Sequence, residues 1–306
     1  MQVHRSIENL PPFNNAVITI GTFDGVHEGH KKIIDALIKE ARLINGEAII
    51  ITFHPHPRKI VKPNEHLQLI NTLEEKIALF EKTGIDHLVI VPFSDEFASQ
   101  SADEYIQNFL IAKFHPHTII IGYDHHFGKG RQGNFMLLAE KADQYNYRLL
   151  EIPKYILDEV GVSSTQIRNA LLQSDIDTAN RLLGYEFFFE GIVIRGDQLG
   201  RKLGYPTANL QYTDRDKIHL GHGVYAVYAE VEGITYKGML SIGNRPTLEN
   251  SDERVEVNIF DFDKEIYGEN VRVTVKKYLR GQEKYASLDE LIKQLGIDKE
   301  NSLTSL

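Results

Sequence analysis

Short apolar runs alternate with amphipathic segments over the first half of the chain. The runs are rich in β-branched residues, which is typical of strands buried on both faces, and they occupy residues 16–20, 48–53, 88–91, 118–121 and 147–152. Helical spacing predicts helices at residues 31–45, 71–80, 101–110 and 135–145. Asn71 and Ser101 each stand three residues before a glutamate, which is capping-box spacing. The alternation predicts an α/β domain, a parallel sheet with helices on both faces.

The pattern changes near residue 187, beyond which strands and turns predominate. Strands are predicted at 187–195, 223–231, 236–242, 253–259 and 271–278. Antiparallel strands in such a run suggest a small barrel, since closure removes exposed sheet edges. A short helix at 174–185 precedes them, with Asp175 or Asp177 as N-cap and Gly184 at its end. A last helix is predicted at 287–295, opened by Ser287 and Glu290. We expect two closely joined domains, 1–184 and 185–306.

Composition narrows the class of protein. The 306 residues are 42% hydrophobic and 25% charged, as in ordinary globular proteins, and the net charge is -9. That charge argues against nucleic-acid partners and against binding to anionic membranes. The absence of cysteine excludes disulfides and thiolate metal sites. No apolar run approaches the roughly 18 residues of a membrane span, and the N-terminus lacks a signal-peptide core, so we expect a cytoplasmic protein.

The segment from Gly21 to His30, with the sequence GTFDGVHEGH, lies between the first predicted strand and the first helix. Free backbone N–H groups and the helix dipole make such a helix start an anion site. His27 and His30 share one face if both lie on the first turn, and Gly29 leaves room for a ligand to approach the backbone. Two imidazoles there suit chemistry at a phosphoryl centre. The alternative is a purely structural turn with a surface histidine pair.

Other loops that follow predicted strands support phosphate chemistry, because ligands of parallel sheets bind beyond the carboxyl ends of the strands. Residues 54–57 (HPHP) form a rigid loop, and residues 122–131 form a Gly-rich loop with Asp124. Asp124 is a candidate to hold a nucleotide hydroxyl or a water on Mg²⁺. In residues 161–168, Ser163 or Ser164 caps a helix that carries Arg168, which predicts a second anion site. A metal site on the histidines at 54–56 and 125–126 is the weaker interpretation, since no known ligand spacing is present.

The second half has its own polar motif, Gly200 to Asn209 (GRKLGYPTAN). In an extended segment the oxygens of Thr207 and Asn209 face one side, which suits Mg²⁺ bridging nucleotide phosphates. Taken alone, a barrel loop with two incidental polar residues explains the motif slightly better. Alternation aims Glu256 away from its valine neighbours. It is either an inward-facing acid that abstracts a proton or one residue of a solvated face.

Taken together, the motifs of the first half resemble those of a known enzyme family. GTFDGVHEGH, TFHPHP, GYDHHFGKGRQGN and VSSTQIR resemble, in this order, the FMN adenylyltransferase module of bifunctional bacterial FAD synthetases. The resemblance implies a Rossmann-like fold and transfer of AMP from ATP to FMN with release of pyrophosphate. His27 and His30 would contact the ATP phosphates and stabilise the migrating charge. It further assigns ATP or its phosphates to Gly21, Phe23, Asp24, Gly29, Asp124, Ser163, Ser164, Thr165 and Arg168. It assigns the flavin to Phe53, Pro55, Pro57 and Phe127, whereas His125 stands where an aromatic residue would be expected.

The second half resembles the riboflavin kinase module of the same bifunctional proteins, through GRKLGYPTANL, GVYAV, SIGNRPT, VEVNIFDFD and YLRGQEKYASLDEL. The resemblance implies a six-stranded antiparallel barrel with a terminal helix, which transfers the γ-phosphate of ATP to the riboflavin 5′-hydroxyl. Gly200, Arg201, Thr207 and Asn209 would bind ATP, Thr207 and Asn209 would hold Mg²⁺, and Gly204 and Pro206 would contact the flavin. Glu256 would be the general base, a smaller contribution than positioning and charge neutralisation.

The resulting hypothesis is a two-step transferase that makes FMN in the barrel and FAD in the α/β domain. Its ligands are riboflavin, FMN, FAD, ATP and Mg²⁺, and we expect a monomer or a weak homo-oligomer. One rival has a single active domain, and another is a flavin-sensing or RNA-binding regulator on a borrowed fold.

Overall fold

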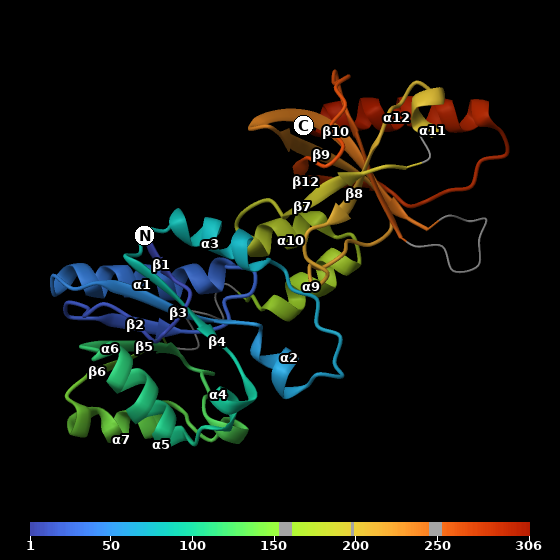
Figure 1. Cartoon of the computed structure of the whole chain (residues 1–306). Coiled ribbons are helices and arrows are strands. Elements are labelled where there is room, and N and C mark those ends of the chain that lie inside the picture. Colours follow the sequence, from blue (N-terminus) through green and yellow to red (C-terminus); the bar gives the residue numbers. More distant parts are fainter. Residues whose placement is uncertain (153–160, 197–198, 245–252) are drawn as a thin grey trace. The chain divides into compact units, whose positions relative to one another are not determined.

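A computed structural model describes residues 1–152, 161–196, 199–244 and 253–306 of the chain. Contacts divide it into two compact units, Met1–Ser164 and Thr165–Leu306, and each is described by itself (Figure 1). Residues 245–247 of the SIGNRPT motif lie outside the described residues. None of the described helices combines the length and apolar character needed to cross a membrane.

The first unit is built on a parallel six-stranded sheet with the strand order β1-β4-β3-β2-β5-β6. The strands are β1 Gln2–His4, β2 Val17–Ile20, β3 Ala48–His54, β4 His87–Pro92, β5 Thr118–Gly122 and β6 Arg148–Ile152. All four residues of β2 are buried, as expected of a strand covered on both faces. The sequence pattern predicted five of these strands and missed β1, an edge strand of three residues that is too short to show a period.

Helices cover both faces of this sheet, as predicted. They are α1 Glu28–Leu43, α2 Pro57–Val61, α3 Leu73–Glu81, α4 Asp95–Ser99, α5 Ala102–Glu104, the π-helix η1 Tyr105–Ile111, α6 Ala112–Phe114, the 3₁₀ turn η2 Lys129–Arg131 and α7 Phe135–Tyr145. Val17 and Ile50 pack with Phe80 of α3 in one core cluster. Ile18 and Ile49, which point to the opposite face of the sheet, pack with Phe109 of η1 in the other cluster. Figure 1 shows α1 and α3 on one side of the sheet and α5 and α7 on the other.

The capping box predicted at Asn71 and Glu74 is wrong by one residue. Thr72 is the N-cap of α3, its Oγ1 accepts from the Glu75 backbone N–H, and the Glu75 carboxylate accepts from the Thr72 N–H. Asn71 is buried before the helix starts, so its amide is not placed to cap it. The box at Ser101 and Glu104 is confirmed.

The second unit is a closed antiparallel barrel with the strand order β10-β11-β8-β7-β12-β9. Its strands are β7 Phe188–Ile194, β8 Ala208–Tyr212, β9 Gly223–Val231, β10 Ile234–Gly243, β11 Arg254–Ile259 and β12 Asn270–Arg280. Pattern reading found five and missed β8, which follows directly from the Gly- and Pro-rich motif. The remaining helices are α9 Ser164–Leu172, α10 Ile176–Leu183, α11 Leu199–Lys202 and α12 Leu288–Ser305.

The last helix continues well beyond its predicted end at residue 295. Asp298, one turn further on, is buried and accepts two hydrogen bonds from Arg280 of β12 at 2.8 and 2.6 Å. This ion pair and the buried Ser302 hold the second half of α12 on the barrel, so Gly296 does not end the helix.

Residues 165–184 pack with the barrel. The Asn180 amide donates to Val275 O at 3.0 Å and accepts from Phe187 N at 2.7 Å, and Ser174 Oγ lies 2.8 Å from Tyr225 OH. Asp175 caps α10, the first of the two N-caps proposed for it. The compact units divide at Ser164, which is earlier in the chain than the expected boundary at residue 184. The boundary between the two functional domains at residue 184 stays a prediction.

Candidate active sites

The turn between β2 and α1 holds the two histidines of the first motif. His27 is the N-cap of α1, and its Nδ1 accepts from His30 N at 3.3 Å. The two imidazole rings stack with a centroid distance of 3.6 Å and an interplanar angle of 14°. The expected common face is therefore confirmed, and the imidazole of His27 satisfies one of the backbone donors at the helix start.

His30 is held as a neutral imidazole. Burial, the adjacent His27 and the ammonium of Lys76 all lower its pKa well below the usual value. Its Nδ1 is buried and has no hydrogen-bond partner in the part of the chain that the structure describes. A neutral imidazole at a helix N-terminus can donate a hydrogen bond to a phosphate oxygen without carrying a fixed charge.

Gly29 lies beside the histidine stack. A Cβ at this position would lie 3.2 Å from the imidazole of His27, so the missing side chain leaves room for that ring, and the predicted room for a ligand stays a prediction. Phe23 and Asp24, both assigned to ATP, are almost completely buried. The Asp24 carboxylate accepts from the Ile70 and Asn71 backbone N–H groups and so supports the turn, and its assignment to ATP stays a prediction.

The serine segment reaches the same turn. Ser164 Oγ donates to Asp24 O at 2.8 Å, so the last residue of the first unit contacts the histidine loop. Thr165 and Arg168 are on α9 in the second unit. Gly21, the first residue of the motif, donates its N–H to Ile51 O and ends the β2 pairing there.

The predicted flavin residues of the first unit fall into two environments. Phe53 is half-buried at the carboxyl end of β3 and contacts Phe93 and Phe97, with centroid distances of 5.4 and 5.9 Å. Phe127 is buried, stacks on Tyr105 at 4.9 Å and belongs to the core. Sequence reasoning did not consider Phe93 and Phe97, although Phe93 stands two residues after a predicted strand, which was an available signal.

One histidine of the first histidine-rich loop has a structural contact. His56 caps α2 through its Nδ1, which accepts from Arg58 N, between Pro55 and Pro57. Across residues 1–152, 161–196, 199–244 and 253–306, no group of three or more His, Cys, Asp or Glu side chains could hold a metal ion. Asp124 is exposed in the loop after β5, and burial lowers the pKa of its neighbour His125 to about 4.

In the barrel unit, the Gly200 motif folds into a compact turn. The Tyr205 N–H donates to Gly200 O at 2.9 Å, and a Cβ on Gly200 would lie 2.3 Å from Tyr205 O. Only a glycine allows this approach. Arg201 is exposed, and Gly204 has a φ of +82°. The turn delivers Pro206 and Thr207 to the start of β8.

Of the two alternatives for Glu256, the structure favours the outer face of the barrel over the interior. Val255 and Val257 fill the interior, and Glu256 lies on the outer face of β11, where Arg254 is 3.5 Å away. Asn209 is its register partner on β8, and side chains directly opposite each other share one face of a sheet. The structure therefore brings Glu256 and Asn209 together.

Asn258 is a site residue that sequence reasoning missed. It is buried, lies two residues after Glu256 on β11, and donates to Pro206 O at 2.6 Å. The amide thereby ties the turn before Thr207 to the strand of the predicted base. Its position at i+2 from Glu256 was the available signal.

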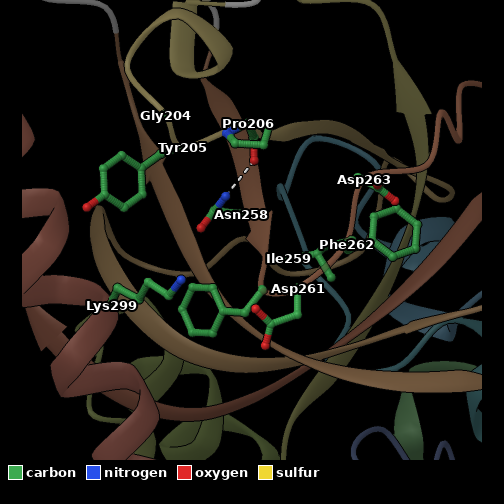
Figure 2. A pocket seen from close by; sticks show the side chains of 10 residues that line it. Gly204, Tyr205, Pro206, Asn258, Ile259, Asp261, Phe262, Asp263 and Lys299 are labelled. Atoms are coloured by element: carbon green, nitrogen blue, oxygen red, sulfur yellow. Dashed lines mark hydrogen bonds between the residues drawn. The ribbon is translucent and has the colours of Figure 1, made fainter.

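A pocket of about 430 Å³ lies beside this turn (Figure 2). Figure 2 shows Tyr205 and Pro206 on one side and Lys299 of α12 on another, with the hydrogen bond from Asn258 to Pro206 between them. Ile259, Phe260, Asp261, Phe262, Asp263 and Gly204 complete the lining. The Lys299 Nζ lies 5.2 Å from the centre of the Phe260 ring. The pocket joins aromatic surface, acids and a cation, which suits a planar polar ligand.

Comparisons with known proteins identify the family of each half of the chain. Residues 11–166 match the family model of FAD synthetase, and residues 183–306 match that of riboflavin kinase. The bifunctional riboflavin kinase/FMN adenylyltransferase of Buchnera aphidicola subsp. Schizaphis graminum is 36% identical over 98% of this chain and 97% of its own length. Its counterpart in Escherichia coli K12 is 34% identical over 98% and 96%. A crystal structure described as a macrolide-efflux protein from Streptococcus pneumoniae has a TM-score of 0.87 and 32% identity, over 98% of this chain and 97% of that one. The protein thus belongs to the bifunctional riboflavin kinase/FMN adenylyltransferases, a family of transferases whose two domains occur here in the same order.

Proposed function

We propose that His27 and His30 carry the FMN adenylyltransferase reaction, and that Glu256, Asn209 and Thr207 carry the riboflavin kinase reaction. The observation that carries the first assignment is the stacked histidine pair at the N-terminus of α1. The register pairing of Glu256 with Asn209, beside the Gly200 turn, carries the second. Each set lies within one unit of the chain.

In the first unit, the FMN phosphate attacks the α-phosphorus of ATP and pyrophosphate leaves. The neutral His30 imidazole donates to a phosphate oxygen, and the helix dipole favours the negative charge that develops. Ser163 and Ser164 add hydroxyl donors, and Asp124 keeps the ATP role that the resemblance assigns. The resemblance also assigns ATP roles to Thr165 and Arg168, which stay part of the proposal although both residues belong to the second unit. The half-buried rings of Phe53, Phe93 and Phe97 offer apolar contact for the isoalloxazine, together with Pro55 and Pro57.

In the barrel unit, Glu256 accepts the proton of the riboflavin 5′-hydroxyl as that oxygen attacks the γ-phosphorus of ATP. The Asn209 amide oxygen and the Thr207 hydroxyl are hard oxygen donors on the same segment, which fits Mg²⁺. Bound with ATP, Mg²⁺ neutralises charge on the transferring phosphate. Gly200 and Arg201 shape the ATP side of the turn, and Gly204 and Pro206 line the adjacent pocket.

Two substitutions in the full chain test the assignments. His30→Ala is expected to abolish FAD formation from FMN and ATP while FMN formation from riboflavin continues. Glu256→Ala is expected to do the reverse. Chromatography of the products from each reaction, with circular dichroism to confirm folding, separates the two steps. Loss of both activities in either folded variant would show that the two sites are not independent.

The rivals make different predictions for the wild type. If only one unit is active, one of the two products does not form under any condition. A flavin-binding regulator would bind riboflavin tightly and form neither product with ATP and Mg²⁺. We also propose a cytoplasmic enzyme that is a monomer or a weak homo-oligomer, which light scattering after gel filtration tests.

A further inference from the structure

The backbone of the histidine turn is strained. Phe23, Gly25 and Val26 have φ values of +47°, +94° and +35°. Only glycine adopts this region without cost, and a β-branched residue such as Val26 is rarely found there. Each such non-glycine residue costs on the order of 1–3 kcal/mol and persists only where its surroundings hold it in place.

The contacts that hold the turn in this conformation come from α3 and from the residues just before it. The Asp24 carboxylate accepts from Ile70 N at 3.0 Å and from Asn71 N at 3.3 Å. The Lys76 Nζ donates to Thr22 O at 2.7 Å. One carbonyl and one carboxylate of the turn are thus fixed to a segment about 50 residues away in the sequence.

Lysine is an unusual residue to bind a buried backbone carbonyl. Lys76 is only 7% exposed, and burying an ammonium is costly unless hydrogen bonds or charges compensate it. Burial lowers the Lys76 pKa, and only the Asp24 carboxylate opposes that shift. Thr52 Oγ1 already donates to the same Thr22 carbonyl at 3.2 Å, so a neutral donor to this oxygen is available. A cation is not needed to satisfy the carbonyl alone.

Unlike the neutral hydroxyl of Thr52, the ammonium of Lys76 also acts electrostatically on the histidine turn. Lys76 belongs to α3, whose Phe80 contacts Phe23 with a ring-centroid distance of 5.6 Å, and Phe23 in turn contacts His30 at 5.1 Å. The charge therefore lies beneath the turn, where it acts on His30 and on any anion above it.

We propose that Lys76 is a positioning residue for adenylyl transfer, which fixes the strained turn through Thr22 O and places its ammonium group beneath the histidine pair. The proposal rests on the assignment of AMP transfer to the first unit. A purely structural role, as the counter-charge of Asp24, is the alternative.

The test uses Lys76→Met, which keeps the length of the side chain and removes both the charge and the donor. Because displacement of reacting groups by about 1 Å costs roughly 100-fold in rate, we expect kcat for FMN adenylylation to fall about 100-fold with little change in the KM for FMN. The pH at which His30 titrates in the activity profile should move upward, since a nearby positive charge that disfavours its protonation is gone. Lys82→Met, at the exposed end of the same helix, is the matched control and should change neither quantity.

Folding is followed in every variant by circular dichroism at the assay temperature and by the kinase activity of the same chain. Thr52→Val provides a milder second variant, because it removes the other donor to Thr22 O without altering a charge. It should lower kcat in the same direction without moving the pH profile. Three results would each overturn the proposal. The folded Lys76→Met variant could keep the wild-type kcat, its loss of kcat could only follow the folded fraction, or the Thr52→Val variant could change KM alone. His30→Ala in the same series separates this failure from failure of the proposed function, in which that variant would stay active.

Discussion

Gly196 provides a sharp test of the kinase site. It lies just after β7, and a Cβ built on it would stand 2.3 Å from Nδ2, 2.5 Å from Cγ and 2.7 Å from Oδ1 of Asn209. Its φ does not lie in the left-handed region, so alanine is compatible with the backbone there. The Gly196→Ala substitution therefore acts on one target, the amide that we propose as a ligand of Mg²⁺ and ATP.

Gly196→Ala should lower the stability of the barrel only slightly but reduce the kinase activity strongly. Pushing a side chain about 30° off its rotamer costs on the order of 0.5–1.5 kcal/mol. For a unit of this size such a loss lowers Tm by only a few degrees, roughly 2–5 °C. Displacing a group of a metal site typically costs about 10–100-fold in activity. We expect riboflavin phosphorylation to fall by that factor while the barrel stays folded.

The assay measures FMN formed from riboflavin, ATP and Mg²⁺, and FAD formed from FMN by the same sample serves as the internal control. Gly281→Ala is the matched variant, because the nearest atom to its new Cβ is Tyr278 OH at an ordinary 3.5 Å. Asn209→Ala should lose a similar factor, and the double variant should lose no more than either single one, since both act through one amide. Full kinase activity in Gly196→Ala, or multiplied losses in the double variant, would refute the reasoning.

Three further predictions concern stability and the flavin site. Asp298→Ala removes the carboxylate that accepts two hydrogen bonds from the partly buried guanidinium of Arg280, and it should lower the free energy of unfolding of the barrel by about 1.5–3 kcal/mol in urea titrations; a loss under about 0.5 kcal/mol would contradict this. Burial alone would raise the pKa of Glu253, but the hydrogen bond from His219 and two nearby histidines hold it below its usual value. Its contribution to stability is therefore complete above the unfolded pKa of about 4.3 and is lost as the pH falls through the lower folded value, and His219→Ala should flatten that acid slope in unfolding experiments. Burial lowers the pKa of His125 to about 4, so it is a neutral ring at pH 6–8; His125→Phe should keep the KM for FMN and His125→Ala should raise it, and equal KM values would exclude ring contact.

Much of the architecture could be predicted because it is periodic. Runs such as Ala48–His54 carry a local signal for a strand buried on both faces, and the Ser101 and Ser287 caps are encoded within four residues. The shift from helix–strand alternation to strands near residue 187 likewise identifies the second fold class. The short strands β1 and β8 escaped because three to five residues cannot show a period when a Pro- or Gly-rich segment adjoins them.

The sequence by itself predicted His27, His30 and Asn209 as site residues, because strand ends and turn motifs single them out without knowledge of distant contacts. Only the tertiary structure decided what those residues do for one another. It placed Lys76 beneath a turn more than 50 positions away, gave the room beside Gly29 to an imidazole, and turned Glu256 to the outside of the barrel. The physical reason is that local patterns report which side of an element is buried. The partner of a buried charge and the register of a strand depend on backbone groups brought near only by folding.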